Sequence, residues 1–320
     1  MTMSACTFDE LKRREGPPLN AWGLYGADDE LGRLNLIDAA AVQRGCDSVK
    51  HGLAINLNLP MSFEPLNPAR APFSHEIIHR RHCNDDHVSL NTQSSTQWDG
   101  FRHYPYQNYP TEGSFTYFGG MSSDDAKDKT VTKYGIQNYA RKPITSRAHL
   151  LDIPLYLQRN GLPPIAHFDQ TTPITLNMLR GCAEDAGVEF QPGDVLLVRT
   201  GWTEAYLALS LEERRKLPER KVRASCGVAQ TEDVLRWHWD NGIAAVASDT
   251  VAYECYPAPA PPSIHEVFLA GWGMPIGELF DLRELSAACT RLKQWTFLFT
   301  SMVLNIEGGI ASPPNAQAIL

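Results

Sequence analysis

The sequence predicts one α/β domain, spanning residues 1–320, built around a mixed β-sheet. Apolar runs of strand length alternate along the chain with segments that have the caps and spacing of helices. The 320 residues contain no internal repeat and no linker-like break between domains. Hydrophobic residues make up 43% of the chain and charged residues 21%, which is ordinary for a globular protein. We therefore expect a chain that buries a large core.

The N-terminal part begins with an arm and leads into the first regular elements. Residues 1–35 are rich in charge, Gly and Pro, and they are expected to lie over the core as an arm. Asp38 is a candidate N-cap for a helix that runs through Val49 and closes near Gly52. Apolar residues at every second position of 53–59 then predict a strand with one buried face.

Residues 60–130 are the least regular part of the sequence. They are dense in Pro, Asn, Ser, His and aromatic residues. A compact domain seldom keeps so long an irregular stretch without a functional reason. We therefore expect the loops of the functional site in this segment.

The second half of the chain returns to regular elements. The apolar runs Ala148–Gln158 and Asp194–Trp202 predict strands, and the segment between them predicts a helix over Leu176–Ala186 that stops at Gly187. Four further segments complete the prediction. They are a helix capped by Thr231 and ended by Asn241-Gly242, a doubly buried strand over Ile243–Ser248, a helix over 283–293 and a strand over 296–304. Residues 305–320, rich in Gly and Pro, are expected to form a C-terminal tail.

The charge of the chain argues against nucleic acid as a partner. Lys and Arg number 29 and Asp and Glu 37, so the formal net charge is −8. No basic cluster is long enough to follow a phosphate backbone. The most basic stretch, Glu212–Lys221, interleaves acids with bases and is typical of a solvated helix or turn.

Cysteine usage and hydropathy indicate a cytoplasmic protein. The seven cysteines are widely separated and form no CxxC pair, so neither a disulfide framework nor a zinc ribbon is predicted. Residues 1–16 lack the apolar region of a signal peptide, and no stretch approaches the roughly 18 apolar residues of a membrane span. We expect no membrane partner.

Histidines and carboxylates gather in the irregular segment, which indicates metal binding or proton transfer. For His79 and His82 a plain polar surface is the alternative interpretation. The members of this group are His75, His79, His82, His87, His103, Asp85, Asp86 and Asp99.

Within this group, the segment 91–103 has the most specific arrangement. Side chains able to offer oxygen or nitrogen to a cation recur at Gln93, Gln97, Asp99 and His103. Gln97 and Asp99 are two residues apart, so on an extended segment they would project to one side while Trp98 points to the other. Such a geometry could hold one ion. Local hydrogen bonding by these residue types is the alternative.

Aromatic residues flank this segment and suggest a small-molecule substrate that is planar and partly apolar. We expect Trp98 and Phe101, and also Tyr104, to lie near the substrate, although such rings also fill cores. His167 is a further candidate for substrate binding. Asp249 is another, because an Asp that ends a buried strand often lies at a ligand mouth; a capping or turn role is the alternative for both.

At residues 93–103 the sequence resembles the cyclase or kynurenine-formamidase-like metal-dependent hydrolases, the family that includes isatin hydrolase. Their signature reads H-x-G-T-H-x-D-x-P-x-H. Thr96, Asp99 and His103 match it, whereas Gln93 and Gln97 stand where the family has metal-binding histidines. Ser95 and Phe101 replace the Gly and the Pro of the signature.

Two further blocks carry the resemblance. Residues 263–278 are similar to the downstream segment of the family, in which a His and a Glu about a dozen residues apart complete the site; His265 and Glu278 occupy these places. Residues 194–202 are similar to a family strand. The blocks occur in the family's order, and the resemblance extends from about Trp22 to Pro314.

The resemblance implies a fold, a metal and an assembly. The fold would be a swivelling β/β/α domain whose mixed sheet forms a partial barrel flanked by helices. A divalent metal would be held by Asp99, with Gln93 and Gln97 and with His265 or Glu278, and its bound water would be the nucleophile. His103 would act as general base and acid. The protein would form a homodimer or homotetramer.

The two glutamines bear on which metal is preferred. An amide oxygen is a neutral and weaker ligand than imidazole, and oxygen-rich sites suit harder ions than zinc. We therefore predict Mn²⁺ in preference, with Mg²⁺ and Zn²⁺ as alternatives.

The predicted function is metal-assisted hydrolysis of a small cyclic amide, lactone or aryl formamide, at a C–N or ester bond. Two alternatives remain: a metal-independent hydrolase that uses Asp99 and His103, and a catalytically silent protein that binds a small molecule. A serine hydrolase fits poorly, because residues 224–227 (ASCG) lack the first glycine of a GxSxG elbow.

Overall fold

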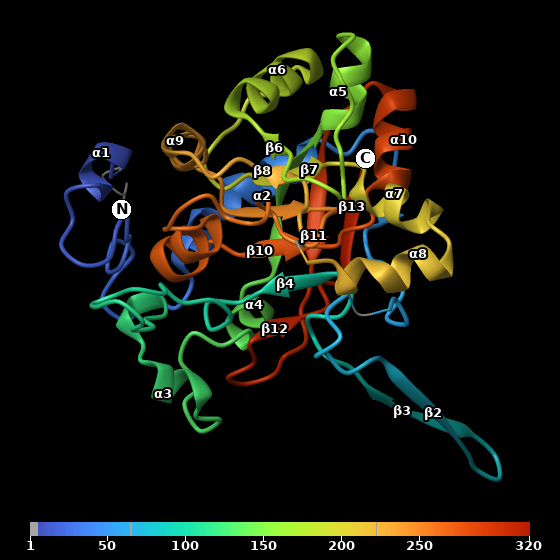
Figure 1. Ribbon diagram of the computed structural model, residues 1–320, viewed down its shortest axis with the longest axis horizontal. Coiled ribbons are helices and arrows are strands. Elements are labelled where there is room, and N and C mark those ends of the chain that lie inside the picture. The colour runs from blue at the N-terminus through green and yellow to red at the C-terminus, as the bar shows by residue number, and fades with distance from the viewer. Residues whose placement is uncertain (1–5, 65, 222) are drawn as a thin grey trace.

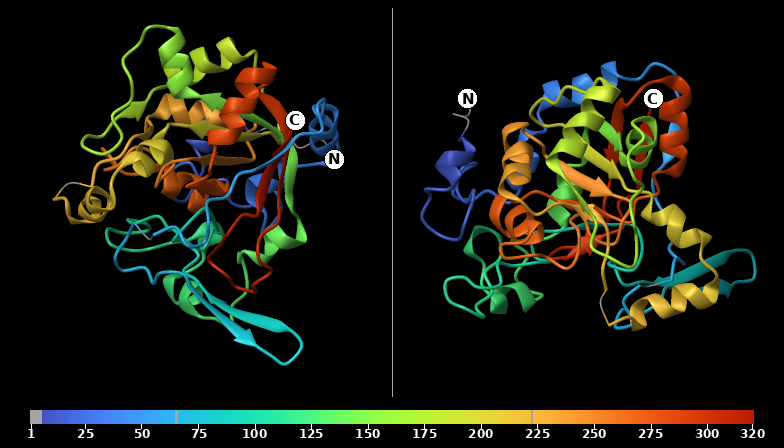
Figure 2. Two further views of the ribbon diagram at one scale, coloured as in Figure 1. Left: turned by 90° about the vertical axis from the view of Figure 1, so that its right-hand side faces the viewer. Right: turned by 45° about the horizontal axis from the view of Figure 1, so that its top comes forward.

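A strongly curled sheet of nine strands runs through the centre of the molecule, flanked by helices (Figures 1 and 2). This computed structural model describes residues 6–64, 66–221 and 223–320. The predicted fold class, a mixed α/β domain, is confirmed. In spatial order the strands are β1 (Ala54–Asn56), β13 (Ala316–Ile319), β11 (Thr296–Ser301), β5 (Ile144–Asp152), β7 (Val195–Arg199), β9 (Ala245–Ser248), β10 (Ile276–Glu278), β4 (Gln97–Asp99) and β12 (Ala311–Ser312).

The sheet is parallel in its middle and antiparallel toward both edges. Strands β5, β7, β9 and β10 are parallel neighbours, and the remaining pairings are antiparallel. The side chains of 195–198 and 245–247 are fully buried. Parallel strands covered on both faces are continuous apolar runs, as these sequences are. This buried centre supports the strands that carry the candidate site.

Helices cover the sheet, and α2 packs against β5 and β11. Among the described residues, no helix has the length and apolar character needed to cross a membrane. The α-helices are α1 (Phe8–Leu11), α2 (Ala39–Asp47), α3 (Ser123–Lys127), α4 (Gln137–Arg141), α5 (Ile153–Arg159), α6 (Leu176–Ala186), α7 (Trp202–Ala208), α8 (Leu211–Lys216), α9 (Glu232–Asp240) and α10 (Arg283–Leu292). The other helical segments are the 3₁₀ turns η1 (Gly32–Leu36), η2 (Phe118–Gly120) and η3 (Leu217–Glu219) and the π-helix η4 (Glu266–Trp272).

The capping residues explain where the predicted helices begin and end. The Asp38 side chain accepts a hydrogen bond from the backbone N–H of Ala41 at 2.8 Å, and α2 begins at the next residue. Helix α6 has the predicted bounds and ends at Gly187, whose φ of 62° lies in the left-handed region. Thr231 precedes α9, but its hydroxyl donates to the Asp233 carboxylate and does not cap the helix backbone.

Two predicted strands are interrupted by helices. The run 148–158 divides at Asp152, where β5 ends and α5 begins, because the Asp152 carboxylate accepts from the backbone N–H of Leu155 and Pro154 occupies the first turn. The run 194–202 likewise ends as a strand at Arg199, and Trp202 begins α7. A continuous apolar run does not distinguish a buried strand from a buried helix, so hydropathy missed both boundaries.

The C-terminal segment 305–320 is part of the sheet, contrary to the prediction of a tail. Strand β12 pairs with β4, and β13 lies between β1 and β11. Ala316, Ala318 and Leu320 are almost completely buried. Small apolar residues inserted between two strands gain burial that only the assembled sheet provides.

Of the predicted arm, residues 6–35 are described and residues 1–5 lie outside the described part. Phe8 and Leu11 are fully buried, and the Phe8 ring packs edge-on against Trp272.

A two-stranded ribbon projects from the body of the protein in both figures (Figures 1 and 2). It consists of β2 (Ser74–His79) and β3 (Asn84–Ser89), with His82 in its turn. Its side chains are mostly exposed, and His75 pairs with Asp86 at 3.0 Å. The histidines of this ribbon therefore form a polar surface, which is the alternative considered for His79 and His82.

Candidate active site

The candidate site is built on the pairing of β4 with β10. In this antiparallel register Glu278 lies opposite Gln97, and Ile276 lies opposite Asp99. Between them Gly277 lies opposite Trp98, and a Cβ at Gly277 would come within 2.7 Å of the Ala247 side chain. Glycine therefore permits the close approach of β10 to its neighbours, which brings Glu278 beside the carboxylate and amides of β4.

His265 reaches the same place from the first turn of the helix that leads into η4. The backbone N–H of Ser263 donates to the Glu266 carboxylate at 2.7 Å, and the backbone N–H of Glu266 donates to the Ser263 hydroxyl at 3.2 Å. This reciprocal capping box fixes the start of the helix, and with it the backbone of His265. π-Helical turns are frequent at functional sites.

Two histidines and two carboxylates converge between these elements. His265 Nε2 lies 3.2 Å from Glu278 Oε1 and 3.6 Å from Asp99 Oδ2. His103 Nε2 lies 3.9 Å from the same Asp99 oxygen. One donor atom from each of Asp99, His103 and His265 lies within 4.8 Å of the others, so these residues form a possible metal site.

Glu254 is a member of this group that the sequence analysis missed. Its Oε1 accepts a hydrogen bond from His265 Nδ1 at 2.7 Å and another from the His265 backbone N–H at 3.2 Å. The carboxylate thus orients the ring and directs Nε2 toward Asp99, as carboxylates do for metal-binding histidines. No motif or periodicity links Glu254 to the other residues, so the sequence offered no signal for it. We name these five residues, Asp99, His103, Glu254, His265 and Glu278, the Asp99 cluster.

Gln93 and Gln97 contact the cluster as hydrogen-bond donors. Gln93 Nε2 donates to Asp99 Oδ1, while Gln97 Nε2 lies 2.8 Å from both Gln93 Oε1 and Glu278 Oε2. Alternation along β4 places Gln97 and Asp99 on one side, as expected. The amide nitrogens face the carboxylates, while Gln97 Oε1 is buried without a hydrogen-bond partner. The role of these amides as metal ligands stays a prediction.

Burial and charge shift the pKa values within the cluster. Burial, together with the negative charge of Asp99, raises the pKa of Glu278 to about 7. Burial lowers the pKa of His103. Burial disfavours the charged form of His265, but the charge of Glu254 and the proximity of three carboxylates raise the pKa of His265 well above its ordinary value. Burial also disfavours the charged form of Asp99, but the charges of both histidines outweigh this effect and lower the pKa of its carboxyl group.

The residues of the cluster fit a divalent cation. Three carboxyl groups face two imidazoles, so carboxyl groups outnumber the groups that can carry positive charge. Asp99 Oδ2 and Glu254 Oε2 are buried without a hydrogen-bond partner, although buried carboxylate oxygens are normally satisfied. Carboxylate oxygen and imidazole nitrogen are ligands for Mn²⁺, Fe²⁺ and Zn²⁺.

Of the three aromatic residues predicted to contact the substrate, two lie in the core and one lies beside the cluster. Trp98 is fully buried, donates from its indole nitrogen to Ser301 Oγ at 2.9 Å and faces the core, because it points away from Gln97 and Asp99 on β4. Phe101 is also fully buried. The structure therefore assigns these two rings to the core instead of the substrate. The ring of Tyr104 lies 5.3 Å from that of His265, beside the cluster.

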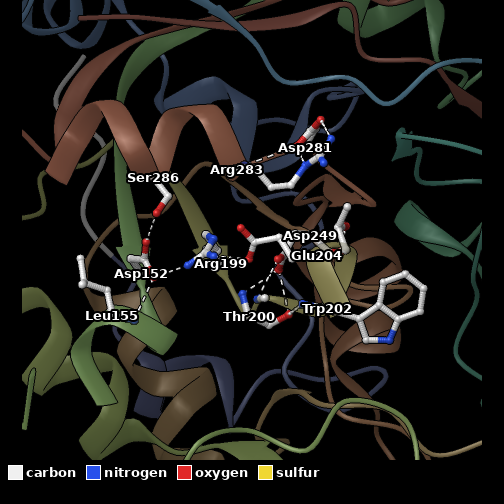
Figure 3. Close-up of polar contacts among 12 residues, drawn as sticks. Asp152, Leu155, Arg199, Thr200, Trp202, Glu204, Asp249, Asp281, Arg283 and Ser286 are labelled. Carbon is white, nitrogen blue, oxygen red and sulfur yellow. Dashed lines mark hydrogen bonds and ion pairs between the residues drawn. The ribbon is translucent and has the colours of Figure 1, made fainter. Parts of the chain in front are cut away.

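Asp249, directly after β9, and His167, in the loop after α5, both form hydrogen bonds to the turn between β7 and α7. The Asp249 carboxylate accepts hydrogen bonds from the backbone N–H of Thr200, from the Thr200 hydroxyl and from the backbone N–H of Gly201 (Figure 3). His167 Nε2 donates to the Thr200 carbonyl at 3.1 Å. Asp249 therefore stabilises a turn, which was the alternative to substrate binding, because both of its carboxylate oxygens accept hydrogen bonds from the turn at Thr200 and Gly201.

A cavity of about 280 Å³ adjoins the cluster. Gln93, Gln97 and Glu278 border it, and its walls include Phe168 and Trp202. Glu278 therefore belongs both to the cluster and to the cavity. A small molecule in this cavity would meet the polar groups at one end and apolar surface along its body.

Known structures share this fold. The chain is similar to a crystal structure described as a novel cyclase, with 26% sequence identity and a TM-score of 0.82 over 94% of this chain and 99% of that chain. Isatin hydrolase A from Ralstonia solanacearum is 16% identical, with a TM-score of 0.54 over 88% of this chain and 94% of that chain. An isatin hydrolase bound to the product analogue thioisatinate is 13% identical, with a TM-score of 0.54 over 88% and 99%. At these low identities, the similarity to the isatin hydrolases shows only that the fold is shared.

Sequence comparison agrees with the resemblance seen at residues 93–103. A search of curated protein sequences gives no match. The family model Cyclase matches residues 50–255, which is more than half of the chain and includes Asp99, His103 and Glu254. The chain therefore belongs to the Cyclase family.

Proposed function

We propose that this protein is a metal-assisted hydrolase of a small cyclic amide, lactone or aryl formamide. The observation that carries the proposal is the convergence of Asp99, His103 and His265 within 4.8 Å, next to a cavity with apolar walls. The shared fold with enzymes named isatin hydrolases supports hydrolysis over other reaction classes.

In this proposal Asp99, His265 and Glu278 hold the cation. With two carboxylates and one imidazole the ligand set is rich in oxygen, which supports Mn²⁺ in preference to Zn²⁺. When bound, the cation would polarise the substrate carbonyl and make water easier to ionise. Glu254 keeps His265 oriented through Nδ1, so that Nε2 is the atom presented to the site.

His103 is the proposed general base and acid. Because burial lowers the pKa of His103, its ring is neutral near pH 7 and can accept a proton. Its side chain is 22% exposed, whereas that of Asp99 is fully buried, so a substrate can approach His103 more readily. As the water oxygen adds to the carbonyl carbon, the water proton passes to His103. When the C–N or C–O bond breaks, His103 returns this proton to the leaving nitrogen or oxygen.

A hydrolysis panel tests the proposal. It contains an N-formylkynurenine-like amide, isatin-like cyclic amides and simple lactones, each assayed with and without Mn²⁺. We expect turnover that increases with Mn²⁺ and falls by about 10²- to 10⁴-fold in His103→Ala, the usual contribution of a general base. His82→Ala, on the exposed ribbon, is the matched control and should retain activity. Absence of turnover across the panel would contradict the proposal.

One observation favours a second candidate, a metal-independent hydrolase. The amide groups of Gln93 and Gln97 already donate to Asp99 and Glu278, at the family positions of two metal-binding histidines. Turnover that is unchanged by EDTA and still abolished by His103→Ala would identify this second mechanism. Binding of panel compounds without turnover would instead indicate a silent binding protein.

A further inference from the structure

Three arginines line the cavity beside the Asp99 cluster, in a chain whose formal net charge is −8. Arg70 comes from the loop between β1 and β2, and Arg220 and Arg223 follow η3. The same cavity is bordered at its polar end by Gln93 and Glu278. Positive charge is therefore concentrated where the proposed substrate would lie.

The three arginines differ in their partners within the protein, and Arg223 is the exposed one of the three. Arg220 has a carboxylate partner, Asp169, at 3.3 Å. Arg70 donates to the Gln93 carbonyl oxygen but forms no ion pair with any described carboxylate. Arg223 has neither a hydrogen bond nor an ion pair to any residue in the described part of the chain. Two guanidinium groups at this cavity thus lack an anionic partner within the protein.

The walls of the cavity indicate the rest of the ligand. Phe168, Trp202, Val251 and Leu279 present apolar surface, and the volume of about 280 Å³ suits a molecule of one or two rings. Glu278 lies at the polar end. Without a cation at the cluster, a negative group placed beside Glu278 would be repelled, whereas the same group beside the arginines would be attracted.

We propose, resting on the hydrolase function above, that the substrate is an anion with a planar apolar body. Its carboxylate would pair with Arg223 and Arg70, its body would lie against Phe168 and Trp202, and its reacting carbonyl would face Glu278 and the cluster. Arg223 is then a specificity-determining residue for carboxylated over neutral compounds. Guanidinium groups recognise carboxylates by paired, charge-assisted hydrogen bonds, which supports this choice of anion.

Binding of two matched probes tests the proposal without turnover. The probes are 3-phenylpropanoate and its neutral amide, 3-phenylpropanamide, measured by calorimetry on the full chain at low ionic strength. We expect the wild type to bind the carboxylate about tenfold more tightly than the amide, the usual size of one charge-assisted pair. In Arg223→Gln this preference should fall to less than about threefold, and Arg223→Lys should retain part of it.

The matched control is Arg215→Gln, an exposed arginine on α8 that changes the net charge equally without lining the cavity. It should keep the wild-type preference. Equal binding of both probes by the wild type would overturn the proposal. A carboxylate preference that survives in Arg223→Gln would also overturn it, because the anion would then bind at the cluster. If the preference depends on Arg223 but no panel compound is hydrolysed, the hydrolase function fails and the anion site stands.

Discussion

Two polar regions of this protein each contain three carboxyl groups but differ in their balance of charge and hydrogen bonding. The first is the Asp99 cluster. The second, the Arg199 network, lies at the carboxyl ends of β5, β7 and β9 and consists of Asp152, Arg199, Thr200, Glu204, Asp249 and Ser286 (Figure 3).

In the Arg199 network the carboxylates are matched by donors. Arg199 pairs with both Asp152, at 2.7 Å, and Glu204. Ser286 donates to the second oxygen of Asp152, and the turn at Thr200 satisfies both oxygens of Asp249. In the Asp99 cluster, by contrast, one oxygen of Asp99 and one of Glu254 have no donor. The comparison teaches that an Asp at the end of a buried strand indicates a ligand site only when its oxygens are left unsatisfied.

The largest expected effect is at Asp99. Asp99→Asn removes the charge that faces both histidines, so kcat/KM on any accepted substrate should fall by at least about 10³-fold, or ~4 kcal/mol of transition-state stabilisation. Circular dichroism should show an intact fold. Near-normal turnover in this variant would break the comparison, since the cluster would then be a structural network like the other.

Asp249 tests the opposite region. Asp249→Ala leaves the backbone N–H groups of Thr200 and Gly201 buried without an acceptor, which should cost about 3 kcal/mol of unfolding free energy. Urea unfolding measures this loss. Turnover per folded molecule should change little. A loss of activity without a loss of stability would indicate instead that Asp249 binds the substrate.

Two buried histidines, His238 and His265, also differ in their charge and hydrogen bonding. Burial lowers the pKa of His238 to about 4, whereas the pKa of His265 is raised. His238 Nδ1 donates to the Val234 carbonyl and Nε2 accepts from the Tyr253 hydroxyl, so the neutral ring is fully satisfied.

His238 should make stability depend on pH below the ordinary pKa of histidine. Above about pH 6.5 both folded and unfolded states keep this ring neutral, so the contribution is constant. As the pH falls from there toward 4, only the unfolded state binds the proton, and about 1.4 kcal/mol is lost per pH unit. Across this pH range, the unfolding free energy of His238→Gln should depend less steeply on pH than that of the wild type, as measured by urea unfolding at each pH. An unchanged slope would show that other groups control acid sensitivity.

The smallest expected effect is at Glu254, which touches the site only through His265. Glu254→Gln keeps an acceptor for Nδ1 but removes the charge, so metal affinity should fall by about tenfold, the lower end for residues that orient a ligand histidine. Titration of Mn²⁺ into metal-stripped protein measures this change. Glu232→Gln, on the exposed start of α9, provides the control. Equal Mn²⁺ affinities in wild type and Glu254→Gln would show that the charge of Glu254 does not help to orient His265 for the metal.

Most regular elements could be predicted because their signals are local. Helix α6 follows from the pattern of its apolar residues and from its terminal glycine, both of which are local signals. The strand boundary at Asp152 was missed, because the same apolar run serves a strand and then a helix. Strands β12 and β13 were missed because their residues gain burial only between strands that are distant in the sequence.

For the site, residue type and family resemblance indicated Asp99, His103, His265 and Glu278, and the structure brings all four together. Alternation on β4 correctly separated Asp99 from Trp98. The clustering of aromatic residues suggested that Trp98 and Phe101 contact the substrate, but both rings are buried in the core, because aromatic composition alone does not distinguish core residues from binding residues.

The sequence by itself determined the fold class, the start of α2 at its Asp38 cap and the chemical types of residue at the site, since each depends on neighbouring residues or on a short motif. Only the tertiary structure decided that Glu254 orients His265, that the glutamines donate to carboxylates and that Asp249 serves a turn. These roles depend on which atoms satisfy one another across up to 181 residues of chain, as between Gln97 and Glu278. Such long-range partners are selected by packing of the whole sheet, and no local pattern specifies them.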